Sequence, residues 1–447
     1  MEKTPLLDDN PQIWQARWSV MSKVISQMAN TLPDDIAHRE MFGQMLINLR
    51  CFGEGQFNYF YDKINKQLAP AGRSHTEALT LTLQQIGRDI SIISQAIHQR
   101  SSNSPSEVQE TIGKADRFAH TVLAPARTLL KEPSSAFVYL QKSPYARVVP
   151  YAPIALIGVS YSCVNFDDNQ KPITRDLLAI AHEVGHYVYW HGSVIQTAAY
   201  EGDLVGQKFH RVLWHHLKAS GVPEWACYWA EEAFADTYGA RTAGPVMAFS
   251  IQDLMQQSWS LDEFTSNDGS HPIPYLRPEI YLQTLAKMGL QARADQLADA
   301  WVVRRDRVAP NTTKLRVTDN LEVTVDEARA VQNKVITLIS RFLANVNYNN
   351  SLVKPLFNDA AAADVQNALE PEDAIFALWR EEMGIRDTNA ARGIAPASAP
   401  FEWQPWYNDT LQEIKAYNVL SGESVLDWVG ILDGGGWTEG PQGPPIR

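Results

Sequence analysis

The pentapeptide His182-Glu-Val-Gly-His186 is the sequence feature that most restricts how this chain can fold. Apolar residues recur around it at helical spacing, which predicts a helix over 174–190 with Val184 and Val188 on the buried face. Residues four apart share one face of a helix, so both imidazoles can bind one metal ion, with Glu183 beside them. A catalytic metal of this kind needs a third protein ligand. The fold must therefore bring a second, distant segment to this helix.

The second segment is expected at Glu231-Glu232-Ala-Phe-Ala-Asp236, on a helix predicted over 228–241. Glu232 and Asp236 are four residues apart and share a face. Glu232 can therefore complete the metal ligands, while Asp236 accepts the second ring N–H of a ligand histidine. Glu231 is the alternative ligand. It is disfavoured because no acidic residue follows it four positions later.

A third histidine follows the pentapeptide but is not expected to bind the metal. His191 lies five residues after His186. At about 100° per residue, its side chain points away from the face that carries the other two imidazoles. The sequence therefore predicts a structural role for His191.

Other stretches predict a mixture of helices and short strands. Apolar residues at helical spacing favour helices through 1–131. Stretches rich in β-forming residues at 137–140 and 155–161 predict strands, and alternation over 315–325 predicts a hairpin. A capping-box pattern begins the helix after this hairpin, at Thr324. The sequence therefore predicts an α+β protein that is mostly helical.

Three blocks that carry the candidate chemistry follow one another along the chain: HEVGHYVYWHG from His182, EEAFADTYGAR from Glu231 and SHPIPYLR from Ser270. Together they resemble the gluzincin zinc metallopeptidases. Within these, the match is to the group of the heat-shock protease HtpX, the CAAX prenyl protease and its soluble relatives. The resemblance covers roughly 134–290.

This resemblance implies a fold and a division of the chain. The fold would contain a zincin-like catalytic domain over 134–290, with a small β-sheet and the His-Glu-x-x-His helix. A helical N-terminal region would precede it over 1–133. A mostly helical C-terminal region, with a small hairpin and an irregular tail, would follow over 291–447.

The resemblance also implies a role for each residue in the first two blocks. His182, His186 and Glu232 would bind one zinc ion. Glu183 would be the general base that takes a proton from the attacking water. Asp236 would orient His182 through its second ring nitrogen.

The third block and the strand before the helix imply further roles. His271 would lie opposite Glu183 and stabilise the charge on the tetrahedral intermediate, and Arg277 would support its loop. The strand at 155–161 stands where this family has an edge strand above the cleft, and such a strand can bind an extended peptide by backbone pairing. The strand residues assigned to substrate binding are Ala155, Ile157 and Val159.

Charge and cysteine content narrow the expected partners. Lys and Arg number 39 against 51 Asp and Glu, a net charge of −12, which argues against nucleic-acid binding. The three cysteines form no Cys-x-x-Cys pair, which argues against a cysteine zinc site and a disulfide scaffold. No signal peptide or membrane-spanning stretch is recognisable, so a cytoplasmic location is expected, with signal-independent export left open.

The expected function is zinc-dependent hydrolysis of peptide bonds in a peptide or protein substrate. Two alternatives remain open. The first is a chaperone or binding module on a peptidase scaffold, with little activity. The second is a zinc amidase that acts on a non-peptide bond. Proteolysis with and without a chelator would separate the first alternative from the peptidase.

Overall fold

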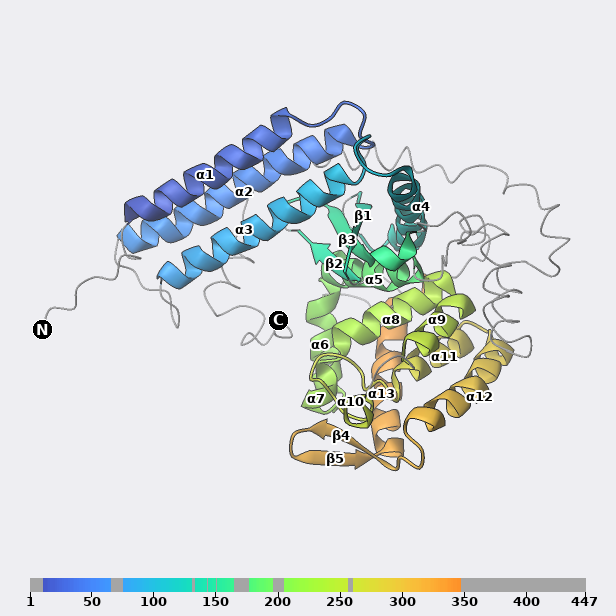
Figure 1. Ribbon diagram of the computed structural model, residues 1–447. Helices are drawn as coiled ribbons and strands as arrows, with labels where there is room; N and C mark the ends of the chain where they lie inside the picture. The colour runs from blue at the N-terminus through green and yellow to red at the C-terminus, as the bar shows by residue number, and fades with distance from the viewer. Residues whose placement is uncertain are drawn as a thin grey trace, which may run out of the picture.

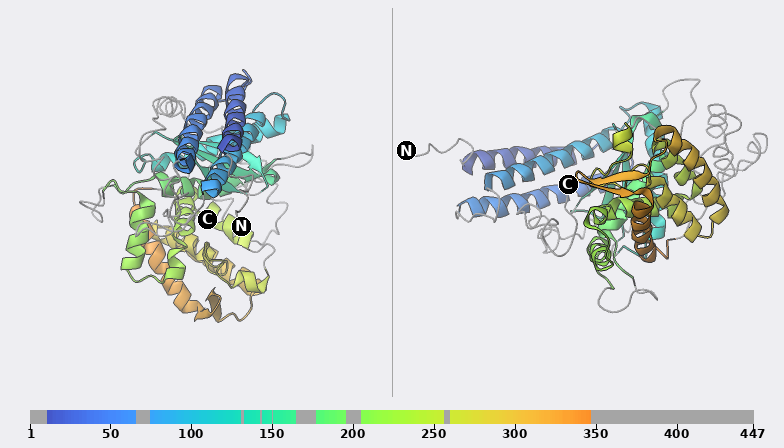
Figure 2. Two further views of the ribbon diagram at one scale, coloured as in Figure 1. Left: turned by 90° about the vertical axis from the view of Figure 1, so that its left-hand side faces the viewer. Right: turned by 90° about the horizontal axis from the view of Figure 1, so that it is seen from below.

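The computed structural model describes residues 11–65, 75–130, 133–142, 144–149, 151–164, 177–195, 205–255 and 260–346. Within these residues the protein is mostly helical with a small sheet, which confirms the predicted α+β class. The N-terminal part contains four helices: α1 (Pro11–Asn30), α2 (Arg39–Asn65), α3 (His75–His98) and α4 (Ser106–Leu123). Helices α1, α2 and α3 lie side by side and project from the rest of the molecule as one long bundle (Figures 1 and 2).

A three-stranded sheet lies next to this bundle. It consists of β1 (Ser135–Gln141), β2 (Tyr145–Val148) and β3 (Ile154–Ser160), in the order β1-β3-β2. Strand β3 pairs in parallel with β1 and antiparallel with β2, so that Ile157 lies between Val138 and Ala146. The prediction that 155–161 forms an edge strand is therefore wrong, because both sides of β3 are already paired.

The predicted substrate contacts on this strand are wrong for the same reason. The side chains of Ala155, Ile157 and Val159 are at most 1 % exposed and belong to the apolar core that also contains α5 (Ala179–His191). Their backbone groups are taken by the neighbouring strands. Neither their side chains nor their backbone can therefore contact a substrate.

The sheet separates two apolar cores. Successive residues of a strand point to opposite faces, and both faces of this sheet are covered. One face packs with α1, α2 and α3, through the strand residues Phe137, Tyr139, Ile154 and Leu156. The other face packs with α4 and α5, through Ala136, Val138, Leu140, Ala155, Ile157 and Val159. The N-terminal helices thus share a core with the sheet, even though the predicted boundary at 133 lies between them.

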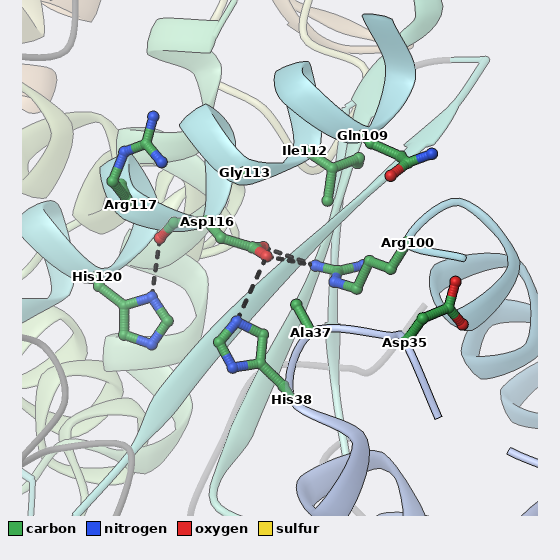
Figure 3. A pocket seen from close by; sticks show the side chains of 10 residues that line it. All are labelled: Asp35, Ala37, His38, Arg100, Gln109, Ile112, Gly113, Asp116, Arg117 and His120. Carbon is green, nitrogen blue, oxygen red and sulfur yellow. Dashed lines mark hydrogen bonds and ion pairs between the residues drawn. The ribbon is translucent and has the colours of Figure 1, made fainter. Parts of the chain in front are cut away.

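The outer edge of β1 is closed by side chains from the end of α3, the residues just after it, and α4. The Val138 N–H donates to Asp116 (2.8 Å), and the Val138 carbonyl accepts from Arg100 (2.9 Å). The side-chain amide of Gln99 bonds both backbone groups of Leu140. Its oxygen accepts from the Leu140 N–H at 2.8 Å, and its nitrogen donates to the Leu140 carbonyl at 2.9 Å. Arg100 and Asp116 also pair with each other at 2.7 Å, in a cavity between α4 and the α1–α2 loop (Figure 3). These bonds satisfy an edge that would otherwise be open to a further strand.

The remaining helices lie on the α5 side of the sheet. They are α6 (Phe209–Ala219), α7 (Glu224–Cys227), α8 (Ala230–Ala243), α9 (Pro245–Met255), α10 (Leu261–Phe264), α11 (Arg277–Lys287), α12 (Gln291–Val308) and α13 (Val325–Phe342). The apolar core around α5 and α8 extends without a break to Val346. The described part of the predicted C-terminal region therefore packs into the same core as α5 and α8.

Several local predictions are confirmed. The predicted hairpin is β4 (Lys314–Thr318) paired with β5 (Leu321–Thr324), and the capping box of Thr324 with Glu327 begins α13. The predicted helix over 174–190 is α5. The first part of that prediction, 174–176, and the predicted irregular tail lie outside the described residues. Among the helices that are described, none combines the length and apolar character needed to cross a membrane.

Candidate metal centre

Helices α5 and α8 meet face to face at the centre of the molecule (Figure 1). They run in opposite directions, because Glu231 at the start of α8 contacts His186 while Asp236, one turn later, contacts His182. Glu232 lies between these two contacts and faces both imidazoles. The structure thus brings together the two segments that the sequence predicted would share a metal ion.

Small residues allow α5 and α8 to approach this closely. A Cβ atom added to Gly185 would lie 2.6 Å from the Cα atom of Ala235 and 3.0 Å from its carbonyl oxygen. Gly239 has a similar role one turn later, where an added Cβ would lie 3.4 Å from the backbone nitrogen of His182. The glycine inside the pentapeptide is therefore needed for the helix spacing that places Glu232 at the histidines.

Substitution of alanine for Gly185 tests this spacing. We expect Gly185→Ala to lower the free energy of unfolding by about 1–3 kcal/mol, the usual cost of overpacking, and to weaken metal binding. The matched control is Gly113→Ala in α4, where an added Cβ meets only the tip of the Arg117 side chain, at 3.8 Å. That variant should gain about 0.5–1 kcal/mol, because alanine favours a helix interior. Urea denaturation of both variants measures the difference, and equal effects would contradict this role for Gly185.

The three candidate ligand side chains have the spacing of a metal site. His182 Nε2 lies 3.0 Å from His186 Nε2 and 3.4 Å from Glu232 Oε2, and His186 Nε2 lies 3.6 Å from Glu232 Oε1. A tetrahedral zinc ion with bonds of about 2.05 Å would separate its ligands by about 3.3 Å. One ion therefore fits between the three side chains, and two histidines with one glutamate are a ligand set used by catalytic zinc.

The charges around these atoms also favour a cation. Burial by itself lowers the pKa of His182, but contacts with Asp236 and Glu232 outweigh it and raise the pKa to about 10. Burial likewise lowers the pKa of His186, whereas Glu232 and Glu231 raise it, and the net shift is upward. The carboxylates thus favour positive charge at this position. A divalent cation bound there would need both imidazoles in their neutral form, because metal ligands must be deprotonated.

Arg277 and Tyr281 of α11 fix the carboxylates on α8. Arg277 donates to Asp236 at 2.8 and 2.9 Å and to Glu232 Oε2 at 2.9 Å, and the Tyr281 hydroxyl donates to Asp236 at 2.7 Å. Arg277 was expected to support the His271 loop, but its hydrogen bonds go to Asp236 and Glu232 on α8. Although burial opposes it, Arg277 helps to lower the pKa of Asp236 to about 2, so this side chain stays ionised.

His271 lies at the rim of the same site. Its Nε2 atom is 3.3 Å from Glu232 Oε1, and its Nδ1 atom is 2.6 Å from Asp268 Oδ2. Burial lowers the pKa of His271, but the bonds to Asp268 and Glu232 outweigh it and raise the pKa to about 9. The side chain is 42 % exposed, so a bound molecule can reach the ring.

Glu183 lies next to the metal-facing atoms on α5 and is itself buried. Burial raises the pKa of this carboxyl, and the neighbouring His182 and His186 lower it in part. A carboxylate whose pKa moves towards neutrality is a better general base. Glu183 is therefore a buried carboxyl with a raised pKa, and its role as a base stays a prediction.

Sequence reasoning also missed residues at this site. Asp268 and Tyr281 were not predicted, and Glu231 was considered only as a ligand. Asp268 has a local signal, because an aspartate three residues before a histidine in a turn can bond both its backbone and its ring. His191 is half-buried and stacked on Tyr187 with the ring centroids 4.4 Å apart, as expected for a structural histidine.

Comparisons with known proteins add no assignment. No family model matches the chain, and the searches of curated proteins and of solved structures found no match either. The functional conclusion therefore depends on the site itself.

Proposed function

We propose that this chain is a zinc-dependent peptidase. The observation that carries the proposal is the convergence of His182, His186 and Glu232 on one point, with their ligand atoms 3.0–3.6 Å apart. Glu183 adjoins this point, and His271 lies at its rim. Zinc bound there would polarise the substrate carbonyl and lower the pKa of a coordinated water to about 7.

The side chains of the protein would carry out the proton transfers. Glu183 would accept a proton from the attacking water and deliver it to the leaving nitrogen. His271, held by Asp268, would donate its Nε2–H to the oxygen on which negative charge develops. Arg277 would keep Glu232 and Asp236 in place during this step.

Strand β3 is central in the sheet, so an extended peptide would have to pair with one of the two edge strands, β1 or β2. The outer edge of β1 is bonded to Asp116, Arg100 and Gln99. Strand β2 forms the opposite edge and packs beside α5, which carries the histidines. We therefore assign backbone pairing with a substrate peptide to β2.

Metal removal tests the proposal. The protein as purified should contain zinc at a ratio near one per chain and hydrolyse a casein substrate. Treatment with 1,10-phenanthroline should abolish hydrolysis, and added zinc should restore it. The control is Glu232→Ala, which should lose zinc and activity together.

Each other outcome would contradict the peptidase. Bound zinc without hydrolysis of casein or of a peptide library would favour a binding module. Hydrolysis of small amides alone would favour an amidase. Hydrolysis that survives complete loss of metal would exclude the proposed chemistry.

A further inference from the structure

We propose that Glu231 is a positioning residue of the metal site, which holds the His186 ring through its Nδ1–H. This inference rests on the proposed zinc site. Glu231 and His186 would form a second carboxylate–histidine pair, at the opposite end of the site from the pair formed by Asp236 and His182. The sequence favoured Glu232 over Glu231 as the ligand and gave Glu231 no other role.

The contacts of Glu231 come from one face of α5. Its Oε1 atom accepts from His186 Nδ1 at 2.9 Å and from Trp190 Nε1 at 2.8 Å. His186 and Trp190 are four residues apart, so both N–H groups point from the same face of α5 towards the first turn of α8. Two donors on a single oxygen fix the carboxylate, which in turn fixes the imidazole.

The hydrogen bond from His186 Nδ1 to Glu231 decides which ring nitrogen of His186 can bind a metal. In a neutral imidazole one nitrogen carries the proton and the other carries the lone pair. A carboxylate at Nδ1 holds the proton there and leaves the Nε2 lone pair for a metal. The Nε2 atom of His186 is the one that lies 3.0 Å from His182 Nε2 and 3.6 Å from Glu232.

The same geometry excludes Glu231 as a ligand. Its carboxylate lies at Nδ1 of His186, whereas the metal-facing atom Nε2 is on the other side of the ring. The contact between Asp236 and His182 is less well aligned than the contact between Glu231 and His186. His182 Nδ1 lies 2.9 Å from Asp236, but no acceptor lies in line with the Nδ1–H bond. The bond from Glu231 is thus the better aligned of the two.

Zinc affinity of the full-length protein, measured by competition with a chromophoric chelator, tests this role. Glu231→Ala should weaken zinc binding by about 10–100-fold, the usual effect of losing the partner of a ligand histidine. Glu231→Gln keeps an acceptor oxygen and should recover much of the affinity. Trp190→Phe removes one donor to Glu231 and should give a smaller loss than Glu231→Ala.

The melting temperature of the zinc-free proteins separates positioning from a structural role. The zinc-free form of Glu231→Ala should melt at the same temperature as the zinc-free wild type, and yet the variant should bind zinc more weakly. Glu224→Ala, at an exposed carboxylate on α7, should change neither value. Wild-type zinc affinity in Glu231→Ala would overturn the inference and leave the proposed peptidase intact. The inference would also be overturned if Glu231→Gln bound zinc as weakly as Glu231→Ala. A wild-type protein that binds no zinc would overturn both.

Discussion

Replacing Glu183 with glutamine is expected to lower kcat for peptide hydrolysis by about 10²–10⁴-fold, the usual contribution of a general base. Glutamine has nearly the same shape but cannot accept a proton from water at neutral pH. Zinc content should stay at the wild-type level, because the metal-facing atoms belong to His182, His186 and Glu232. Turnover of a fluorogenic peptide and metal analysis of the same sample measure both effects.

The matched control is Glu224→Gln on α7, which makes the same chemical change at an exposed side chain. It should retain wild-type kcat and zinc content. Full activity in Glu183→Gln with zinc present would exclude Glu183 as the base. Loss of zinc in that variant would instead show that Glu183 helps to hold the metal.

Replacing Asp116 with alanine is expected to lower the free energy of unfolding by about 3–5 kcal/mol, the cost of removing one partner from a buried ion pair. The side chain of Arg100 is 2 % exposed, so its charge would remain buried without its partner. The N–H of Val138 would also lose its acceptor at the edge of β1. Urea denaturation measures this loss.

Glu110→Ala is the control for this prediction. Glu110 is on the same helix and pairs with Lys114 one turn away, but its side chain is 68 % exposed. Exposed pairs of this kind contribute about 0.3–0.5 kcal/mol, so the variant should be nearly as stable as the wild type. If the two variants lost similar stability, the bonds at the edge of β1 would not hold the sheet as described.

Local patterns predicted the parts of the site that lie on single helices. Spacing of four residues placed His182 and His186 on one face of α5, and Glu232 and Asp236 on one face of α8. The choice of Glu232 over Glu231 as the metal-facing carboxylate agrees with the distances. Short-range rules sufficed here because each pair belongs to one helix.

Strand order could not be predicted in this way. The apolar stretch that forms β3 is compatible with an edge or a central position, since a run of buried residues does not record its neighbours. Its place between β1 and β2 is set by pairing with two strands that both precede it in the sequence. The contact of Glu231 with Trp190 was missed for a similar reason, because it joins residues on two different helices that are 41 positions apart in the chain.

Helices pack on both faces of the three-stranded sheet, and this limits how far the chain can be truncated. A fragment that began near 134 would leave Phe137, Tyr139, Ile154 and Leu156 exposed to water, although all four are fully buried in the intact protein. Burial of such side chains contributes about 1.5–3 kcal/mol each, and together they rival the total stability of a domain, about 5–15 kcal/mol. Expression of a fragment that begins near 134 would therefore yield an aggregation-prone polypeptide, and truncation studies should preserve the first three helices.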